Sequence, residues 1–242
     1  MDPKRILITR TDRLGDVVLS TPIIRYIRKS YPDAYIAFMV KPENRDIVAN
    51  NPHLDEVIVY DKRGEQKSFL STVKFAQKLK QKKFDTAIAL HPTNRVHIML
   101  FLARIPVRIG YDRKMGHLLT KKIPHNKQKG LKHEVDYSFD LLKNAGFYVK
   151  GAGRKPYMTT SEEDKHLVDA VFKDSDLRDN IIAIHVGASC SSKRWFPERF
   201  AKVADILHEK FNSNIVFVGG DETSEYTKKA VSSMKYNAVD LT

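Results

Sequence analysis

Short apolar runs alternate with longer amphipathic segments through the first half of the chain. The runs are rich in Ile, Val and Ala, and they predict buried β-strands at residues 4–10, 34–40, 56–61, 84–90 and 107–111. Between the runs, apolar positions recur at helical spacing and predict helices at residues 17–31, 42–49, 68–82 and 95–103. Strands that alternate with helices pair in parallel through right-handed crossovers, so this pattern predicts a doubly wound α/β sheet.

The pattern weakens beyond residue 111 and then begins again. Residues 114–132 form a basic stretch without periodicity, residues 133–145 predict a helix, and the Gly-, Pro- and Lys-rich residues 148–160 predict a linker. A second unit follows, and its pattern predicts alternating helices and strands at residues 161–172, 180–188, 198–211, 214–220, 222–234 and 238–242. We therefore expect two domains, residues 1–160 and 161–242.

The second domain contains too few expected strands to stand alone. Two or three parallel strands do not make a sheet that helices cover on both faces. We therefore expect the C-terminal domain to be incomplete, either because the gene is truncated or because further residues complete it.

The composition is that of a globular protein with a large excess of positive charge. The 242 residues are 42% hydrophobic and carry a net charge of +13. No apolar run is long enough to span a membrane and the N-terminus lacks a secretory signal, so we expect a cytoplasmic protein. A single cysteine, Cys190, fits a reducing compartment. The charge favours anionic partners such as nucleic acid, lipid head groups or phosphorylated sugars, and a solvated basic surface is the alternative explanation.

The first candidate site is the loop after the first strand, residues 11–16. In open α/β sheets, ligands bind beyond the carboxyl ends of the strands. Gly15 would let the backbone approach a ligand closely, and the following helix would direct its amides toward it. Asp16 is placed either to cap that helix or to act as a general base. Arg10 and Arg13 flank it and are candidate phosphate ligands, although exposed arginines usually remain solvated.

Two further loops follow strands of the second domain. The loop at residues 185–197 combines small residues, serines and Lys193 before a helix, which favours phosphate binding, yet it lacks the spacing of a P-loop. Its Trp195 is better explained as a core anchor or helix staple, and His185 is either a satisfied buried histidine or a ligand-binding residue. The third loop contains Gly219, Gly220 and Glu222, and Glu222 binds a ribose or simply occupies a first turn. The scattered histidines do not predict a metal site.

Taken together, these segments resemble the heptosyltransferases of glycosyltransferase family 9. The resemblance covers nearly the whole chain and rests on four segments, ILITRTDRLGDVVLSTPIIRYIRKSYPDAYIAFMV, DTAIALHPTNR with VRIGY, HVGASCSSKRWFPERFAKVADIL and IVFVGGDE. It implies a GT-B fold, in which an N-terminal Rossmann-like domain takes the lipid A–inner core acceptor and a C-terminal one takes the nucleotide sugar. It also implies transfer of heptose from ADP-heptose with inversion, without a metal or other cofactor, at the inner-membrane surface.

The resemblance also assigns roles to individual residues. Asp16, of the Gly-Asp pair, corresponds to the catalytic base, and Lys193 to the lysine that binds the donor phosphate. Residues Ala188 and Ser189 would line the diphosphate, and Glu222 would lie near the donor nucleoside. Among the basic residues of the N-terminal domain, the candidates for acceptor phosphate binding are Arg10, Arg13 and Arg95.

The chain departs from the family pattern in two places. It reads W-F-P where many members read W-P, and it ends before the later Asp-Thr/Ser-Gly and His motif that completes the donor site. Three alternatives therefore stay open: a non-catalytic remnant, a glycosyltransferase that uses another nucleotide sugar, and a nucleic-acid-binding protein. The last is disfavoured because no RRM, KH or helix-turn-helix signature occurs.

Overall fold

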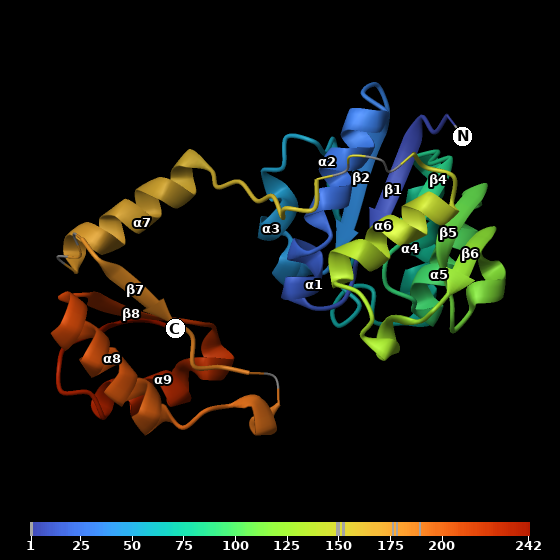
Figure 1. The fold of residues 1–242 in the computed structure, drawn as a ribbon. Coiled ribbons are helices and arrows are strands. Elements are labelled where there is room, and N and C mark those ends of the chain that lie inside the picture. Colours follow the sequence, from blue (N-terminus) through green and yellow to red (C-terminus); the bar gives the residue numbers. More distant parts are fainter. Residues whose placement is uncertain (1, 149–150, 152, 176, 178, 189) are drawn as a thin grey trace. The chain divides into compact units, whose positions relative to one another are not determined.

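The computed structural model describes residues 2–148, 151, 153–175, 177, 179–188 and 190–242. It divides into two compact units, residues 1–160 and residues 161–242, and each contains its own parallel sheet (Figure 1). The α/β class predicted from the strand–helix alternation is thereby confirmed.

Unit 1 is built on a six-stranded sheet in the order β3-β2-β1-β4-β5-β6, with every neighbouring pair parallel. The strands are β1 (Arg5–Thr9), β2 (Tyr35–Val40), β3 (Glu56–Val59), β4 (Thr86–Ala89), β5 (Val107–Asp112) and β6 (Lys121–Pro124). Three consecutive residues of the central strand, Ile6, Leu7 and Ile8, are fully buried. Continuous burial of this kind occurs because helices cover both faces of a parallel sheet.

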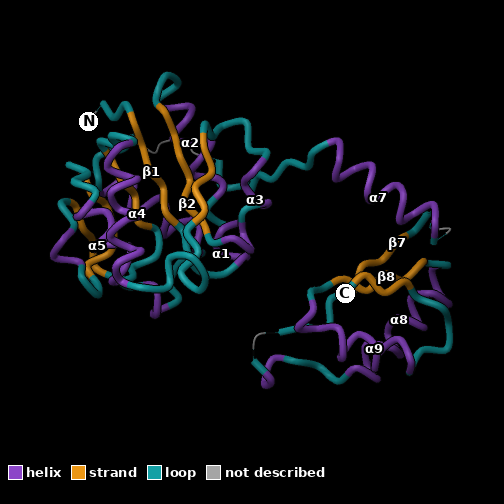
Figure 2. Tube along the Cα trace, turned by 180° about the vertical axis from the view of Figure 1, so that it is seen from behind, coloured by secondary structure: helices purple, strands orange, loops and turns teal. Residues whose placement is uncertain are grey.

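Two layers of helices enclose this sheet. Their members are α1 (Leu14–Val18), α2 (Thr21–Ser30), α3 (Asp46–Ala49), α4 (Phe69–Gln81), α5 (Asn94–Leu102) and α6 (Glu134–Asn144). Helices α2 and α6 pack on one face, where Ile24 and Leu142 enter the core (Figure 1). Helices α4 and α5 pack on the other face through Phe75 and Met99 (Figure 2). The order of the strands places the ends of β1 and β4 at the middle of one sheet edge.

The sequence pattern differs from the structure at two places in unit 1. The single helix expected at 17–31 is two helices, because Pro22 cannot continue α1 and the hydroxyls of Ser20 and Thr21 bond to the carbonyls of Asp16 and Val18. The basic stretch at 114–132 contains β6, which we did not predict. This edge strand alternates half-buried and exposed residues and has no apolar run.

Much of the expected linker is tied to unit 1. The amide of Tyr157 donates to Thr21 Oγ1 at 2.9 Å, and the hydroxyl of Thr159 donates to the carbonyl of Asn50 at 2.5 Å. Arg154 also pairs with Asp136 at 2.6 Å. Because these contacts hold residues 154–159 on helices α2, α3 and α6, the segment belongs to the first unit.

Unit 2 has a parallel sheet in the order β7-β8-β9. Its elements are α7 (Glu162–Asp174), β7 (Ile181–Ile184), α8 (Pro197–Phe211), β8 (Asn214–Val218), α9 (Ser224–Ser232) and β9 (Val239–Leu241). Its core is small and is centred on the fully buried Phe217. Trp195 packs edge-on against Phe200 at 5.2 Å, which is the contact of a hydrophobic staple at the start of α8.

We predict that Phe217→Ala destabilises unit 2 by about 3–5 kcal/mol, because it removes the largest fully buried side chain from a small core. Hydrogen exchange followed by mass spectrometry should show lost protection in β8 and α8 and unchanged protection in residues 1–148. Phe211→Ala is the control, since Phe211 at the end of α8 is 58% exposed. Equal loss of protection in both variants would contradict the prediction.

Candidate active site

The carboxyl edge of the unit 1 sheet carries a cluster of ionisable side chains. Strands β1 and β4 are parallel neighbours, so the loops that follow them lie side by side. Asp12 comes from the first loop and His91 from the second, and His91 Nδ1 lies 3.0 Å from Asp12 Oδ2. Helix α1 begins at the same edge and carries Asp16 in its first turn.

At the centre of this cluster is Arg10, whose side chain is only 3% exposed. Its Nε donates to Asp12 Oδ1 at 2.7 Å, its Nη1 donates to Glu134 Oε1 at 2.8 Å, and its Nη2 lies 3.1 Å from Asp16 Oδ1. Glu134, at the start of α6, also accepts from Lys127. One buried guanidinium therefore holds three carboxylates that would otherwise repel each other.

Asp12 and Asp16 have different surroundings, which shift their pKa values in opposite directions. Burial opposes ionisation of Asp12, but the hydrogen bond with His91 and the charge of Arg10 outweigh it and lower the pKa of Asp12 to about 2. Burial is also the largest influence on Asp16. Although Arg10 opposes it, the nearby carboxylates of Asp12 and Glu134 act in the same direction, and the pKa of Asp16 is raised. Asp16 is thus the more basic carboxylate, and at 30% side-chain exposure it is open to solvent.

The capping role considered for Asp16 finds no support in the hydrogen bonds of α1. The N-cap residue is Arg13, and no side-chain hydrogen bond caps this helix. A Cβ added to the adjacent Gly15 would meet no atom within 4 Å, so there is open space beside the backbone at this turn. The Asp16 carboxylate is thus not used as a cap, and the backbone at Gly15 is accessible from solvent.

The three arginines predicted to bind acceptor phosphate have different environments. The guanidinium of Arg10 is buried and occupied by carboxylates, which corrects the prediction that it is open to a phosphate. Arg95 is half-buried and donates to the carbonyls of Gln66 and Lys67 at 3.2 and 2.5 Å. Arg13 is exposed to solvent. Of the three, Arg13 alone presents its charge freely at the sheet edge.

Cationic side chains that we did not single out also border this edge. Lys62 follows β3 and donates to the carbonyl of Thr11 at 3.2 Å. Its pKa is lowered by burial and by the positive charges of Lys41 and Arg63. Together with Arg13, Lys62 forms a cationic rim along this sheet edge. Such a rim favours the binding of an anionic ligand over that of a neutral one.

Four residues of the cluster were missed by the sequence analysis, namely Asp12, His91, Lys127 and Glu134. Asp12 lies in the loop that we had selected, whereas Glu134 is 124 positions from Arg10 in the chain. No periodicity or motif spacing links such distant residues. The signal that would have helped is chemical, because an arginine directly after a buried strand requires carboxylate partners.

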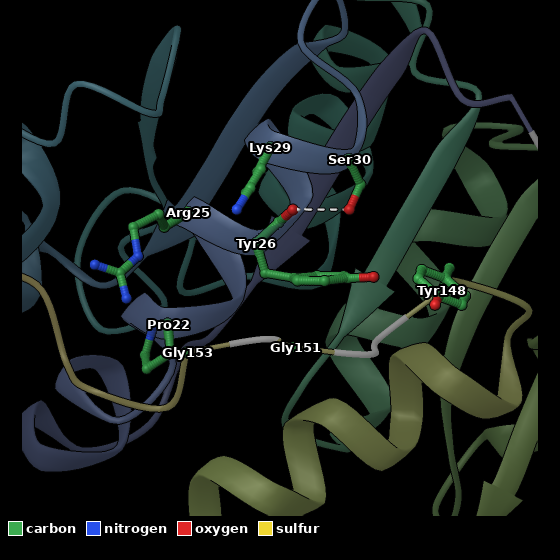
Figure 3. Close-up of a pocket in the computed structure, with 8 residues that line it drawn as sticks. All are labelled: Pro22, Arg25, Tyr26, Lys29, Ser30, Tyr148, Gly151 and Gly153. Atoms are coloured by element: carbon green, nitrogen blue, oxygen red, sulfur yellow. Dashed lines mark hydrogen bonds between the residues drawn. The ribbon is translucent and has the colours of Figure 1, made fainter.

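A separate hollow of about 490 Å³ lies beside α2, away from this cluster (Figure 3). Arg25, Tyr26 and Lys29 of the helix line it together with Tyr148. None of its described lining residues carries a carboxylate or an imidazole. It therefore lacks the acid–base groups of the sheet edge.

In unit 2, two glycines bring the loops after β7 and β8 into contact. A Cβ on Gly187 would lie 2.2 Å from Thr223 Cγ2, and one on Gly219 would lie 2.1 Å from Thr223 Oγ1. Only glycine fits at these approaches without displacing the buried Thr223. His185, which is exposed rather than buried, joins the same loops through Nδ1 at 2.9 Å from the carbonyl of Val218.

The predicted donor-binding residues lie on these two loops. Lys193 is exposed at the end of a 3₁₀ turn, and the carbonyl of half-buried Ala188 accepts from Arg194 Nε at 2.8 Å. Glu222 is exposed on the neighbouring loop. Ser189 lies outside the described residues. Among the residues that the structure describes, no group of His, Cys, Asp and Glu is arranged to hold a metal ion.

Two α/β units, each with its own parallel sheet, are the architecture of a GT-B glycosyltransferase, and solved glycosyltransferases share it. The model of one protein family, glycosyltransferase family 9 (heptosyltransferase), matches residues 72–242. The chain belongs to this family.

Individual relatives agree with that assignment. The chain is 26% identical over 220 residues to the lipopolysaccharide core heptosyltransferase OpsX of Haemophilus influenzae, covering 89% of this chain and 60% of that protein. The crystal structure of a family 9 glycosyl transferase from Veillonella parvula matches with a TM-score of 0.90 at 27% identity, covering 98% of this chain and 69% of that one. The E. coli ADP-heptose lipopolysaccharide heptosyltransferase II has the same fold, with a TM-score of 0.81 at 21% identity over 98% and 72%. The chain spans about 60% of the length of the curated relatives it matches.

We predict that Arg10→Met destabilises unit 1 by about 3–5 kcal/mol at neutral pH, because it leaves three carboxylates without their buried partner. In the native protein, the lowered pKa of Asp12 adds stability that is lost as pH falls from about 4 toward 2. In the variant, protonation relieves repulsion, so part of the lost stability should return on acidification. Urea unfolding across pH measures both effects.

The matched control for this prediction is Arg13→Met, which removes the same charge from an exposed position three residues away. It should change stability by less than about 0.5 kcal/mol. If the two variants unfold at the same urea concentration, Arg10 does not hold the cluster together.

Proposed function

We propose that the protein transfers a heptose from ADP-heptose to the inner core of lipopolysaccharide, with inversion at the anomeric carbon. The observation that carries this proposal is Asp16, a solvent-accessible carboxylate with a raised pKa at the strand edge of a family 9 chain. The names of the relatives support the substrates, since OpsX is a lipopolysaccharide core heptosyltransferase and the E. coli protein is an ADP-heptose enzyme. Unit 1 would take the acceptor and unit 2 the donor.

In the proposed reaction, Asp16 removes the proton of an acceptor hydroxyl. The freed oxygen forms a bond to the anomeric carbon of the heptose while the bond from that carbon to the diphosphate breaks. The ADP leaves with the electron pair of that bond, and the proton stays on the Asp16 carboxylate. Arg10 positions Asp16 for this step, and burial together with the neighbouring carboxylates raises the pKa of Asp16, which helps it to accept the proton.

The departing diphosphate would be stabilised by groups on the unit 2 loops. Lys193 supplies a full positive charge, and the region of Ala188 and Ser189 supplies small residues that let the phosphates approach the backbone. Glu222, on the neighbouring loop, would accept from the nucleoside hydroxyls. The lysine takes the part that a divalent ion plays in other transferases, so no cofactor is required.

The cationic rim of unit 1 fits a phosphorylated acceptor. Arg13 and Lys62 lie at the edge that carries Asp16, with Arg95 on the neighbouring helix α5. A lipid A–inner core acceptor is acidic and membrane-anchored, so we propose that the protein works at the cytoplasmic face of the inner membrane, as a peripheral protein. The net charge of +13 would then attract the acidic acceptor, and nucleic acid would not be the partner.

We predict that Asp16→Asn lowers transfer at least about 10²-fold while the protein stays folded, because the amide cannot accept the proton. In the native protein, transfer should fall on the acid side with a midpoint above the ordinary aspartate value of about 3.9, since the pKa of Asp16 is raised. Heptose transfer from ADP-heptose to heptose-deficient lipopolysaccharide measures both.

The control for Asp16 is Asp46→Asn, which alters a carboxylate that is 93% exposed on α3. The assay should use this chain alone and a longer form, in which the C-terminal residues of a full-length family 9 relative are fused to it. Transfer by the longer form alone makes this chain an incomplete enzyme. If both forms are folded and neither transfers heptose, the proposed donor or the proposed acceptor is wrong. If Asp16→Asn transfers at the native rate, Asp16 is not the base.

We predict that Lys193→Gln slows transfer by about 10²-fold and weakens ADP binding, because a cation at the developing diphosphate charge is lost. Lys202→Gln, on the exposed face of α8, is the matched control and should leave both unchanged. Calorimetric titration with ADP separates binding from the rate. A variant that binds ADP normally and transfers at the native rate would rule out this role for Lys193.

A further inference from the structure

Helices α4 and α5 present an outer surface of unit 1. They lie side by side on one face of the six-stranded sheet (Figure 2). Their inner residues, among them Phe75, Leu79 and Met99, are buried against the strands. Their outer residues face away from the sheet, and with the turns that flank both helices they make up what we call the α4–α5 surface.

The two helices of the α4–α5 surface carry positive charge without any acidic residue. Residues 66–83 contain no Asp or Glu but several lysines: Lys67, Lys74, Lys78, Lys80, Lys82 and Lys83. Residues 90–111 likewise contain no Asp or Glu and include Arg95, Arg104 and Arg108. Such a segregated field attracts polyanions far more strongly than the same charge spread among carboxylates.

The cations at the middle of this surface are free to bind. Lys82 pairs with Glu56 at 2.6 Å, and Arg95 and Arg108 donate to backbone carbonyls. Lys74, Lys78 and Lys80 are exposed, and within the described chain none of these three has an ion-pair partner.

Large apolar side chains stand beside these lysines. Leu70 is 73% exposed and Phe69 is 60% exposed in the first turn of α4, and Phe101 is 48% exposed at the end of α5. Leu70 and Lys74 are four positions apart, so they share one side of the helix. A groove lined by Val73, Lys80 and Phe101 runs between the two helices. Phe69 and Leu70 lie at one end of the surface and Phe101 lies toward the other. Exposed apolar residues beside unpaired cations mark a surface that binds a partner.

Unpaired lysines together with exposed apolar side chains favour one kind of anionic partner over another. A nucleic acid would engage the lysines but would leave Leu70 and Phe69 in water. A bilayer with anionic lipids offers phosphates to the lysines and an apolar layer to the side chains between them. We propose that the α4–α5 surface docks unit 1 on an anionic phospholipid bilayer.

The fold relates this surface to the candidate active site. Because α4 follows β3 in a parallel sheet, its first turn lies at the carboxyl edge, the edge that also carries Asp16. Docking through Phe69 and Leu70 would hold that edge near the membrane. The proposal therefore rests on the proposed function, since a lipid-anchored acceptor would be presented there.

The test is flotation with vesicles, in the absence of substrate. The protein should bind vesicles of phosphatidylcholine with phosphatidylglycerol and not vesicles of phosphatidylcholine alone. Binding should weaken between ~0.1 M and ~1 M salt, as the screening length falls from about 10 Å to about 3 Å. Equal binding to both kinds of vesicle, or binding to neither, would overturn the proposal.

Matched variants locate the contact. Lys74→Gln combined with Lys78→Gln should lower partitioning onto anionic vesicles by about tenfold or more. The control is Lys29→Gln with Lys143→Gln, which removes the same charge from exposed positions on helices α2 and α6 of the opposite face. Equal losses would show that only the total charge matters and would overturn the proposal.

A second pair of variants tests the apolar contact at constant charge. Leu70→Ser should lower partitioning several-fold, whereas Leu131→Ser, which alters a leucine that is 76% exposed before α6, should not. An unchanged Leu70→Ser protein would leave the lysines as a general polyanion site and overturn the bilayer assignment. Transfer to a soluble, delipidated acceptor should be native in all these variants, so failure of the proposed reaction and failure of the membrane contact give different results.

Discussion

The buried guanidinium of Arg10 is the interaction on which the candidate active site depends. Three carboxylates within reach of one another would be unstable at this edge without a cation between them. Arg10 makes their proximity possible. Burial, together with the neighbouring carboxylates, raises the pKa of Asp16, while His91 and Arg10 keep Asp12 ionised. The ion cluster thus surrounds the carboxylate that we propose as the catalytic base.

In both units, parallel pairing of the strands places the loops that follow neighbouring strands side by side. In unit 1 it brings the loop after β1 beside the loop after β4, which joins Asp12 to His91. In unit 2 it brings the loops after β7 and β8 together on Thr223, where Gly187 and Gly219 leave room for the contact. Each proposed site is therefore formed by several loops at the carboxyl ends of neighbouring strands, and a single sequence motif does not form it.

The net charge of +13 is distributed in two different ways. At the sheet edge, Arg10 and Lys127 are matched by half-buried carboxylates, so positive charge there stabilises the fold. On the α4–α5 surface, Lys74, Lys78 and Lys80 have no ion-pair partner within the described chain, and we propose that their charge binds a partner. The isoelectric point does not distinguish paired cations from unpaired ones, because both contribute equally to the net charge. The two kinds of cation are distinguished by their positions in the tertiary structure.

The sequence by itself determined the α/β class, most of the helices and strands, and the loops that carry Asp16, Lys193 and Glu222. It did so because helical and strand periodicity are local, and because parallel sheets place ligands at strand ends. It missed β6, whose edge position needs no apolar run, and it read α1 and α2 as one helix across Pro22. Only the tertiary structure joined Arg10 to Glu134 across 124 positions and revealed that Arg10 is buried. Such pairings depend on where the folded chain brings charges together, and a linear pattern does not contain that information.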